Sequence, residues 1–140
     1  TLISQTRCKR ILGGKRKSLM AKIMVVDDET ALLNLVSEFL SEDLGHEVSM
    51  YESAELAIQA ISDTTGYFPD LLITDYKMHG MTGADLIEEI HKKIKPVKNI
   101  LITGYLEKEI QEALAPFSTI CIRKPVSLAS LEVLINQVLE

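Results

Sequence analysis

Acidic residues, a threonine and a lysine recur in this sequence, each directly after a short apolar run. Asp27 and Asp28 follow the first run, Asp75 follows a later one, and Thr103 and Lys124 come after or at the end of two more. Three carboxylates that converge on one pocket repel each other, and one lysine cannot neutralise them. A divalent cation can, and an oxygen-only ligand set favours Mg²⁺. The residue types therefore predict a magnesium site.

The same residue types suit phosphoryl transfer. A carboxylate beside Mg²⁺ and a lysine is equipped to attack a phosphoryl group and form an aspartyl phosphate. The cation and the ammonium group balance charge on the transferring oxygens, and a threonine hydroxyl can hydrogen-bond one of them. Asp75 lies between the acidic pair and Lys124 in the predicted strand order, so it is the predicted nucleophile.

The elements between these residues must bring them to one place. Short apolar runs predict strands at 23–26, 46–51, 71–73, 99–103 and 118–122. Apolar stripes at helical spacing predict helices at 32–40, 53–61, 86–94, 106–114 and 128–138. This alternation predicts an α/β fold, a doubly wound (βα)5 three-layer sandwich with a parallel sheet. In the order 2-1-3-4-5, the strand ends that carry the polar residues surround one crevice.

Length and composition agree with one compact domain. The chain has 140 residues, of which 46% are hydrophobic and 25% charged, which is typical of globular proteins. No apolar run approaches the length of a membrane-spanning helix, so no membrane partner is expected. The two cysteines, Cys8 and Cys121, have neither a disulfide nor a metal-ligand pattern, which favours a cytoplasmic location.

Charge divides the chain into two parts. Residues 1–21 contain six basic and no acidic residues, which leaves nine Lys/Arg against twenty Asp/Glu in 22–140. The acidic body argues against direct nucleic-acid binding by the domain. We expect residues 1–20 to be a basic extension outside the fold and 21–140 to be the folded domain. A linker, or an arm that binds nucleic acid or membrane, is the alternative for the extension.

Residues 21–140 resemble a response-regulator receiver domain. The matching motifs are Asp27-Asp28 after Ile23–Val26, Asp75 followed by Met78 and Gly83, Thr103-Gly104, and Lys124-Pro125. The resemblance implies a flavodoxin-like fold with strand order 2-1-3-4-5. It implies that Asp75 accepts a phosphoryl group from a histidine kinase or phosphotransfer protein. It also implies that Lys124 contacts this group, that Thr103 moves to meet it, and that the Lys124–Pro125 peptide is cis.

The resemblance further assigns the cofactor and the partners. Asp28, Asp75 and the Lys77 carbonyl would bind Mg²⁺, with Asp27 in support. The domain would act as a signalling switch that catalyses only its own phosphorylation and dephosphorylation. Its output would be a downstream effector or a homodimer, bound through the face of the fourth helix, fifth strand and fifth helix.

Two positions depart from the family pattern. His79 stands where the family usually has proline, which predicts a less rigid loop after Asp75. Cys121 stands where the family usually has its switch aromatic. We therefore expect Thr103 movement to be read out through the loop to Tyr105. His79 and the other two histidines are far apart in the sequence, so no metal or phosphohistidine role is predicted for them.

Other functions fit the sequence less well. A degenerate receiver that binds partners without phosphorylation is one alternative. A haloacid-dehalogenase-type phosphatase uses similar residues, but its nucleophile follows the first strand and its acidic pair comes last, the reverse of the order here. A flavodoxin-like cofactor binder would need Gly, Ser or Thr in the first loop, where this chain has Asp27-Asp28-Glu29.

Overall fold

The computed structural model describes residues 20–62, 66–105 and 107–140. Its strands are β2 (Lys22–Val26), β3 (Glu47–Tyr51), β4 (Leu71–Asp75), β5 (Lys98–Thr103) and β6 (Ile120–Arg123). Its α-helices are α1 (Thr30–Glu38), α2 (Ala54–Ser62), α3 (Gly83–Lys93), α4 (Lys108–Leu114) and α5 (Leu128–Leu139). A π-helical turn, η1 (Phe39–Asp43), extends α1, and a 3₁₀ turn, η2 (Ala115–Phe117), extends α4. The predicted extension falls on residues outside this description, except for Met20, as does Leu106 of the predicted fourth helix.

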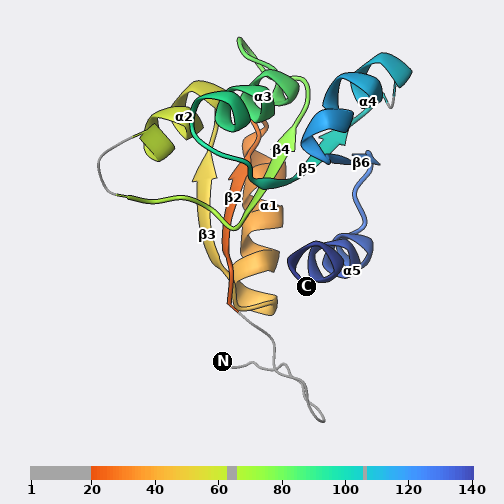
Figure 1. The fold of residues 1–140 in the computed structure, drawn as a ribbon. Coiled ribbons are helices and arrows are strands. Elements are labelled where there is room, and N and C mark those ends of the chain that lie inside the picture. The colour runs from red at the N-terminus through yellow and green to blue at the C-terminus, as the bar shows by residue number, and fades with distance from the viewer. Residues whose placement is uncertain (1–19, 63–65, 106) are drawn as a thin grey trace.

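The five strands form one parallel sheet in the order β3-β2-β4-β5-β6. In chain order this is 2-1-3-4-5, so the predicted topology is confirmed. Figure 1 shows the strands side by side, with α2, α3 and α4 on one side of the sheet and α1 and α5 on the other. Because all strands run the same way, the loops after β2, β4, β5 and β6 leave the sheet at one edge.

Alternate strand residues feed two separate cores, one on each face of the sheet. Met24, Val26, Leu72 and Leu101 pack with buried residues of α2, α3 and α4. Ile23, Val25, Leu71, Ile73, Ile100 and Ile102 pack with buried residues of α1 and α5. The sheet is therefore covered on both faces, which explains why β2 and β4 read as continuous apolar runs. The predicted three-layer sandwich is confirmed.

Several element boundaries differ by a few residues from the sequence-based expectation; the helix predicted at 32–40, for example, is α-helical only to Glu38 and continues as the π-helical turn η1. The fifth strand begins at Ile120 rather than at Ser118, because Ser118 adopts a left-handed conformation (φ 56°) at the end of η2. On α1 the buried stripe includes Leu33, whereas Leu32 is only half-buried. Both residues are leucines, so the apolar pattern alone could not choose the inward face.

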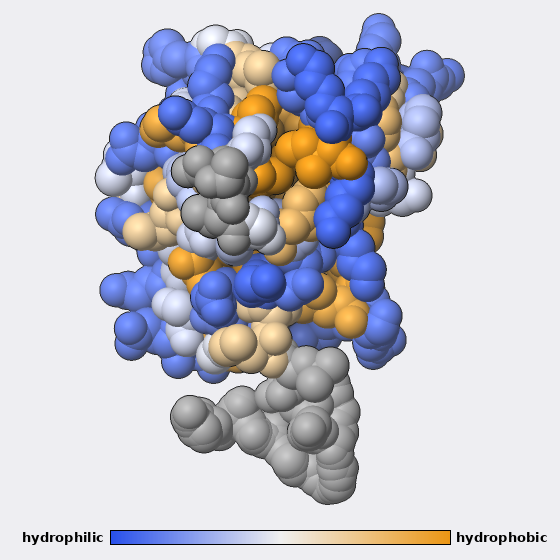
Figure 2. Space-filling view, turned by 60° about the vertical axis from the view of Figure 1, so that its left-hand side comes forward, coloured by the Kyte–Doolittle hydropathy of each residue, from blue (hydrophilic) through white to orange (hydrophobic). Residues whose placement is uncertain are grey.

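The surface is mostly polar with scattered apolar positions. Figure 2 shows hydrophilic side chains over most of one face, with apolar patches between them. None of the helices in the described residues has the length and apolar character needed to cross a membrane.

Candidate functional site

Three carboxylates meet at the carboxyl edge of the sheet. Asp27 and Asp28 directly follow β2, and Asp75 is the last residue of β4, the neighbouring strand. Each offers an oxygen, and the three oxygens lie within 4.8 Å of one another. Asp27 is 4% exposed and Asp75 is 6% exposed, whereas Asp28 is half-buried. The spacing of these oxygens fits a hard cation with oxygen ligands.

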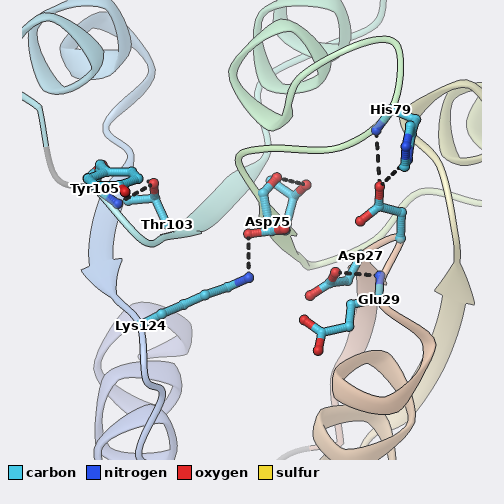
Figure 3. A network of polar contacts seen from close by, with 9 residues as sticks. Asp27, Glu29, Asp75, His79, Thr103, Tyr105 and Lys124 are labelled. Carbon is cyan, nitrogen blue, oxygen red and sulfur yellow. Dashed lines mark hydrogen bonds and ion pairs between the residues drawn. The ribbon is translucent and has the colours of Figure 1, made fainter.

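Lys124 brings a positive charge within ion-pair distance of this cluster. Its Nζ lies 3.1 Å from Asp75 Oδ1 (Figure 3). Its backbone N–H donates to the Thr103 carbonyl over 2.8 Å, which fixes the chain between β6 and α5 against the end of β5. The Lys124–Pro125 peptide is cis, as the family resemblance implies.

Burial and like charge raise the pKa of both inner carboxyls. The pKa of Asp27 is raised to about 6, mainly by burial. The hydrogen bond that Asp27 accepts from the Glu29 N–H opposes the rise, and the negative charge of Asp75 adds to it. Burial also raises the pKa of Asp75, and outweighs the opposing hydrogen bond and charge of Lys124. Burial acts to lower the pKa of Lys124. The hydrogen bond to Asp75 and the negative charge of Asp75 outweigh this effect, so the pKa of Lys124 is raised. The metal-free site therefore disfavours full ionisation.

The start of α3 packs closely against the end of β4 and fixes the backbone at Asp75. Gly83, the first residue of α3, lies so near that an added Cβ would be 2.1 Å from the Asp75 carbonyl oxygen. Its N–H donates to the Tyr76 carbonyl over 2.8 Å. Thr82 and Asp85 form a capping box that starts α3 at this point. Glycine is therefore required at position 83 because any side chain would collide with the β4 backbone.

The Thr103 hydroxyl forms hydrogen bonds within its own loop rather than with the carboxylates. It donates to the Tyr105 carbonyl over 2.9 Å and accepts the Tyr105 N–H over 3.1 Å. Figure 3 shows this pair to one side of Asp75, with Lys124 approaching from below. Tyr105 is 73% exposed. The structure therefore joins Thr103 to the loop before α4.

The predicted site residues are thus only partly brought into contact. Asp27, Asp28, Asp75 and Lys124 cluster as expected, whereas the Thr103 hydroxyl bonds to the main chain of its own loop. Lys77 is exposed two residues after Asp75, and the role of its carbonyl stays a prediction.

His79 is a site neighbour that the sequence reasoning missed. Its ring Nδ1 lies 2.9 Å from Asp28 Oδ2, and its backbone N–H donates to the same oxygen over 3.0 Å. The two residues are 51 positions apart, so no spacing pattern could have signalled the contact. The available signals were the departure from the family's usual proline and the location of His79 four residues after Asp75, on a loop that leaves the same sheet edge.

Further hydrogen bonds hold the loop that carries His79. The Met81 N–H donates to Glu55 Oε2 over 3.3 Å, and Gly80 takes a left-handed conformation (φ 81°) beside this carboxylate. The loop is therefore anchored to the start of α2 and to Asp28. The histidine main chain supplies one anchor that a proline cannot, because proline has no N–H.

Comparison with known families agrees with this geometry. The sequence model of the response regulator receiver domain matches residues 23–136. The match covers most of the chain and includes Asp27, Asp28, Asp75, Thr103 and Lys124. The chain belongs to the response regulator receiver family, and it is a signalling domain of the two-component type.

Individual relatives support the same assignment. The two-component response regulator PhoP of Pseudomonas aeruginosa is 32% identical over 120 residues, which are 84% of this chain and 51% of PhoP. Sporulation initiation phosphotransferase F of Bacillus subtilis is 29% identical over 93 residues, 66% of this chain and 72% of that protein. A CheY-like receiver domain from Methanospirillum hungatei superimposes with a TM-score of 0.78 at 30% identity, covering 86% and 94% of the two chains.

These relatives differ in what else they contain. The chain spans about half the length of PhoP and less than a third of a protein-glutamate methylesterase from Rhizobium johnstonii. Both comparisons concern the receiver part, so the activities of the remaining parts of those proteins do not transfer to this chain.

Proposed function

We propose that Asp75 accepts a phosphoryl group in a Mg²⁺-dependent reaction, with a histidine kinase or phosphotransfer protein as donor. Phosphorylation then changes the binding of a partner, and we expect this switch to operate in the cytoplasm. The observation that carries the proposal is the position of Asp75, with Lys124 Nζ at 3.1 Å on one side and the Asp27–Asp28 pair on the other.

The proposed reaction assigns a role to each side chain. A carboxylate oxygen of Asp75 attacks phosphorus, the bond from phosphorus to the donor's leaving group breaks, and an aspartyl phosphate forms. The Lys124 ammonium group already contacts the attacking carboxylate, so it can also contact the oxygens of the incoming phosphoryl group. Its charge is placed to balance the negative charge that the phosphoryl group brings into a buried site.

The carboxylate cluster fits the metal that the family implies. The donors are oxygens, two of the three residues are buried, and one lysine leaves their charge uncompensated. Asp28 and Asp75, with the Lys77 carbonyl, would hold Mg²⁺, and Asp27 would support it. When bound, the cation would lower the charge repulsion between the carboxylates and the phosphoryl oxygens. Ionisation of Asp27, which the metal-free site disfavours, would then become favourable.

Thr103 supplies the link to a partner surface. Its hydroxyl can bond to a phosphoryl oxygen only by giving up its donation to the Tyr105 carbonyl. That exchange would free the start of the α4 segment, which bears the exposed Tyr105 ring. We propose that the face of α4, β6 and α5 then binds an effector or a second copy of the domain.

The proposal is tested by exposing the protein to a small acyl phosphate donor and weighing the intact product. We expect the mass of one phosphoryl group to be added with Mg²⁺ and little addition in EDTA. Asp75→Asn should abolish the gain, whereas Asp43→Asn, a change at an exposed aspartate far along the chain, should not. No gain in the wild type would instead favour a degenerate receiver that binds partners without phosphorylation.

A further inference from the structure

His79 contacts Asp28 through two donors on one acceptor. The ring Nδ1 and the main-chain N–H lie 2.9 and 3.0 Å from the same carboxylate oxygen, Oδ2. The His79 side chain is fully exposed, with a relative accessibility of 101%. Burial therefore does not explain where the ring lies, and the bond to Asp28 is the interaction that holds it.

We propose that His79 is a positioning residue for the metal site, where it fixes the orientation of the Asp28 carboxylate. The inference rests on the proposed magnesium site. Two hydrogen bonds to Oδ2 define the rotation of the carboxylate about its last bond. The other oxygen, Oδ1, accepts no hydrogen bond from the described residues and stays available to a cation. A ligand that is already oriented loses less conformational freedom when the metal binds.

The contact also joins the two loops that carry the proposed ligands. Asp27 and Asp28 lie on the loop after β2, while Asp75 and Lys77 lie at the end of β4 and on the loop that follows. His79 is on this second loop, so its bonds to Asp28 connect one loop to the other across the cation position. Loss of the ring would leave one connecting bond from His79, and loss of the N–H as well would leave none.

The chemistry of the pair indicates which atom carries the proton. An ionised carboxylate accepts hydrogen bonds and cannot donate. Nδ1 must therefore carry hydrogen in this contact. A nitrogen that carries hydrogen cannot ligate a metal, so Nδ1 acts on Asp28 and not on the cation in this arrangement.

A competing effect would have the opposite sign. If the two bonds occupied the lone pairs that the cation needs, His79 would weaken Mg²⁺ binding, and its removal would strengthen it. A carboxylate offers about four acceptor positions on two oxygens, and His79 uses only those on Oδ2. Mg²⁺ takes few carboxylate oxygens and retains several waters. Positioning is therefore the expected net effect.

The test compares Mg²⁺ dissociation constants, measured by titration calorimetry, in four forms of the protein at about pH 8, above the raised pKa of Asp27. His79→Ala removes the ring bond and keeps the N–H. His79→Asn restores a short side-chain donor, and His79→Pro removes both bonds. We expect about three- to tenfold weaker binding for His79→Ala, less than the usual loss for buried outer-shell partners because Asp28 is half-exposed. His79→Asn should approach the wild type, and His79→Pro should bind most weakly.

The outcomes separate the two proposals. Absence of saturable Mg²⁺ binding by the wild type would overturn the proposed metal site itself. Wild-type binding with equal or tighter binding by His79→Ala would refute the positioning role alone. Melting temperatures in EDTA provide the second readout, and His79→Ala should melt with the wild type because the ring is exposed. A loss of stability in EDTA that matches the loss of affinity would show a structural role and contradict the proposal.

Discussion

Removal of the Asp27 charge should stabilise the metal-free protein. The pKa of Asp27 is raised from 3.8 to about 6, chiefly by burial. Each pKa unit corresponds to about 1.4 kcal/mol, so ionised Asp27 costs the folded state roughly 3 kcal/mol at neutral pH. Asp27→Asn avoids that cost and keeps an oxygen to accept the Glu29 N–H. Its buried amide N–H groups reintroduce a cost of about 1–2 kcal/mol if they find no partner. The expected net gain is about 1–2 kcal/mol.

The effect has a defined pH dependence. A carboxyl with a raised folded-state pKa binds more protons in the folded than in the unfolded state between about pH 4 and 6. Stability from this residue is therefore complete at low pH and is lost as the pH rises through the folded pKa. Near pH 4, where the wild-type carboxyl is largely protonated, Asp27→Asn retains only the amide cost and should be less stable than the wild type by about 1 kcal/mol. Above about pH 6 it should be more stable than the wild type.

The assay is urea unfolding in EDTA at several pH values, with Asp43→Asn as the exposed control. If thermal unfolding is used in place of urea, a gain of 1–2 kcal/mol corresponds to a rise of about 3–8 °C in melting temperature for a chain of this size. Magnesium should then stabilise the wild type more than the variant, because a bound cation offsets the cost of the buried Asp27 charge, which the variant lacks. A variant that is no more stable than the wild type at neutral pH, or equally stabilised near pH 4, would refute the electrostatic reasoning.

Three further predictions follow from other contacts of the site. Magnesium should raise the melting temperature of the wild type but much less that of Asp28→Ala, and equal shifts in thermal denaturation would contradict the ligand assignment. Gly83→Ala should destabilise the fold by about 1–3 kcal/mol in urea, because its Cβ would meet the Asp75 carbonyl; unchanged stability would show that the two segments can separate. Tyr105→Ala keeps the main-chain bonds to the Thr103 hydroxyl and removes the exposed side chain of the same loop, so it should alter amide exchange in residues 107–115 and the lifetime of the phosphoryl group if that side chain takes part in the readout. If neither quantity changes, the readout through this loop is wrong.

The fold could be predicted from the sequence because its signals are local and repeated. Each buried strand is a short apolar run, each helix has an apolar stripe, and their alternation permits few arrangements. The edge strand β3 is half-exposed, and its place outside β2 was part of the strand order that the family resemblance implied. The start of β6 was harder, because the left-handed Ser118 gives no composition signal.

Part of the candidate site could be predicted from the sequence and part could not. Asp27, Asp28, Asp75 and Lys124 lie directly at strand ends, so the topology alone brings them together. Side-chain orientation does not follow from topology. The bond of the Thr103 hydroxyl to its own loop depends on local backbone geometry that residue spacing does not encode.

The contact between His79 and Asp28 could not be predicted from the sequence for a related reason. It joins residues 51 positions apart on two irregular loops. Periodicity constrains helices and strands, but it does not determine the path of a loop between them. The departure from the family's usual proline marked position 79, but it predicted a less rigid loop rather than a contact.

Phosphorylation at Asp75 is tested most directly by locating the phosphoryl group in the intact chain. The wild type is treated with a small acyl phosphate and Mg²⁺, and then with a hydride reductant, which converts an aspartyl phosphate to homoserine and releases phosphate. Peptide mass mapping should find homoserine at position 75 and unmodified aspartate at positions 27 and 28. Homoserine at another position, with Asp75 unmodified, would contradict the assignment of Asp75 as the phosphoacceptor.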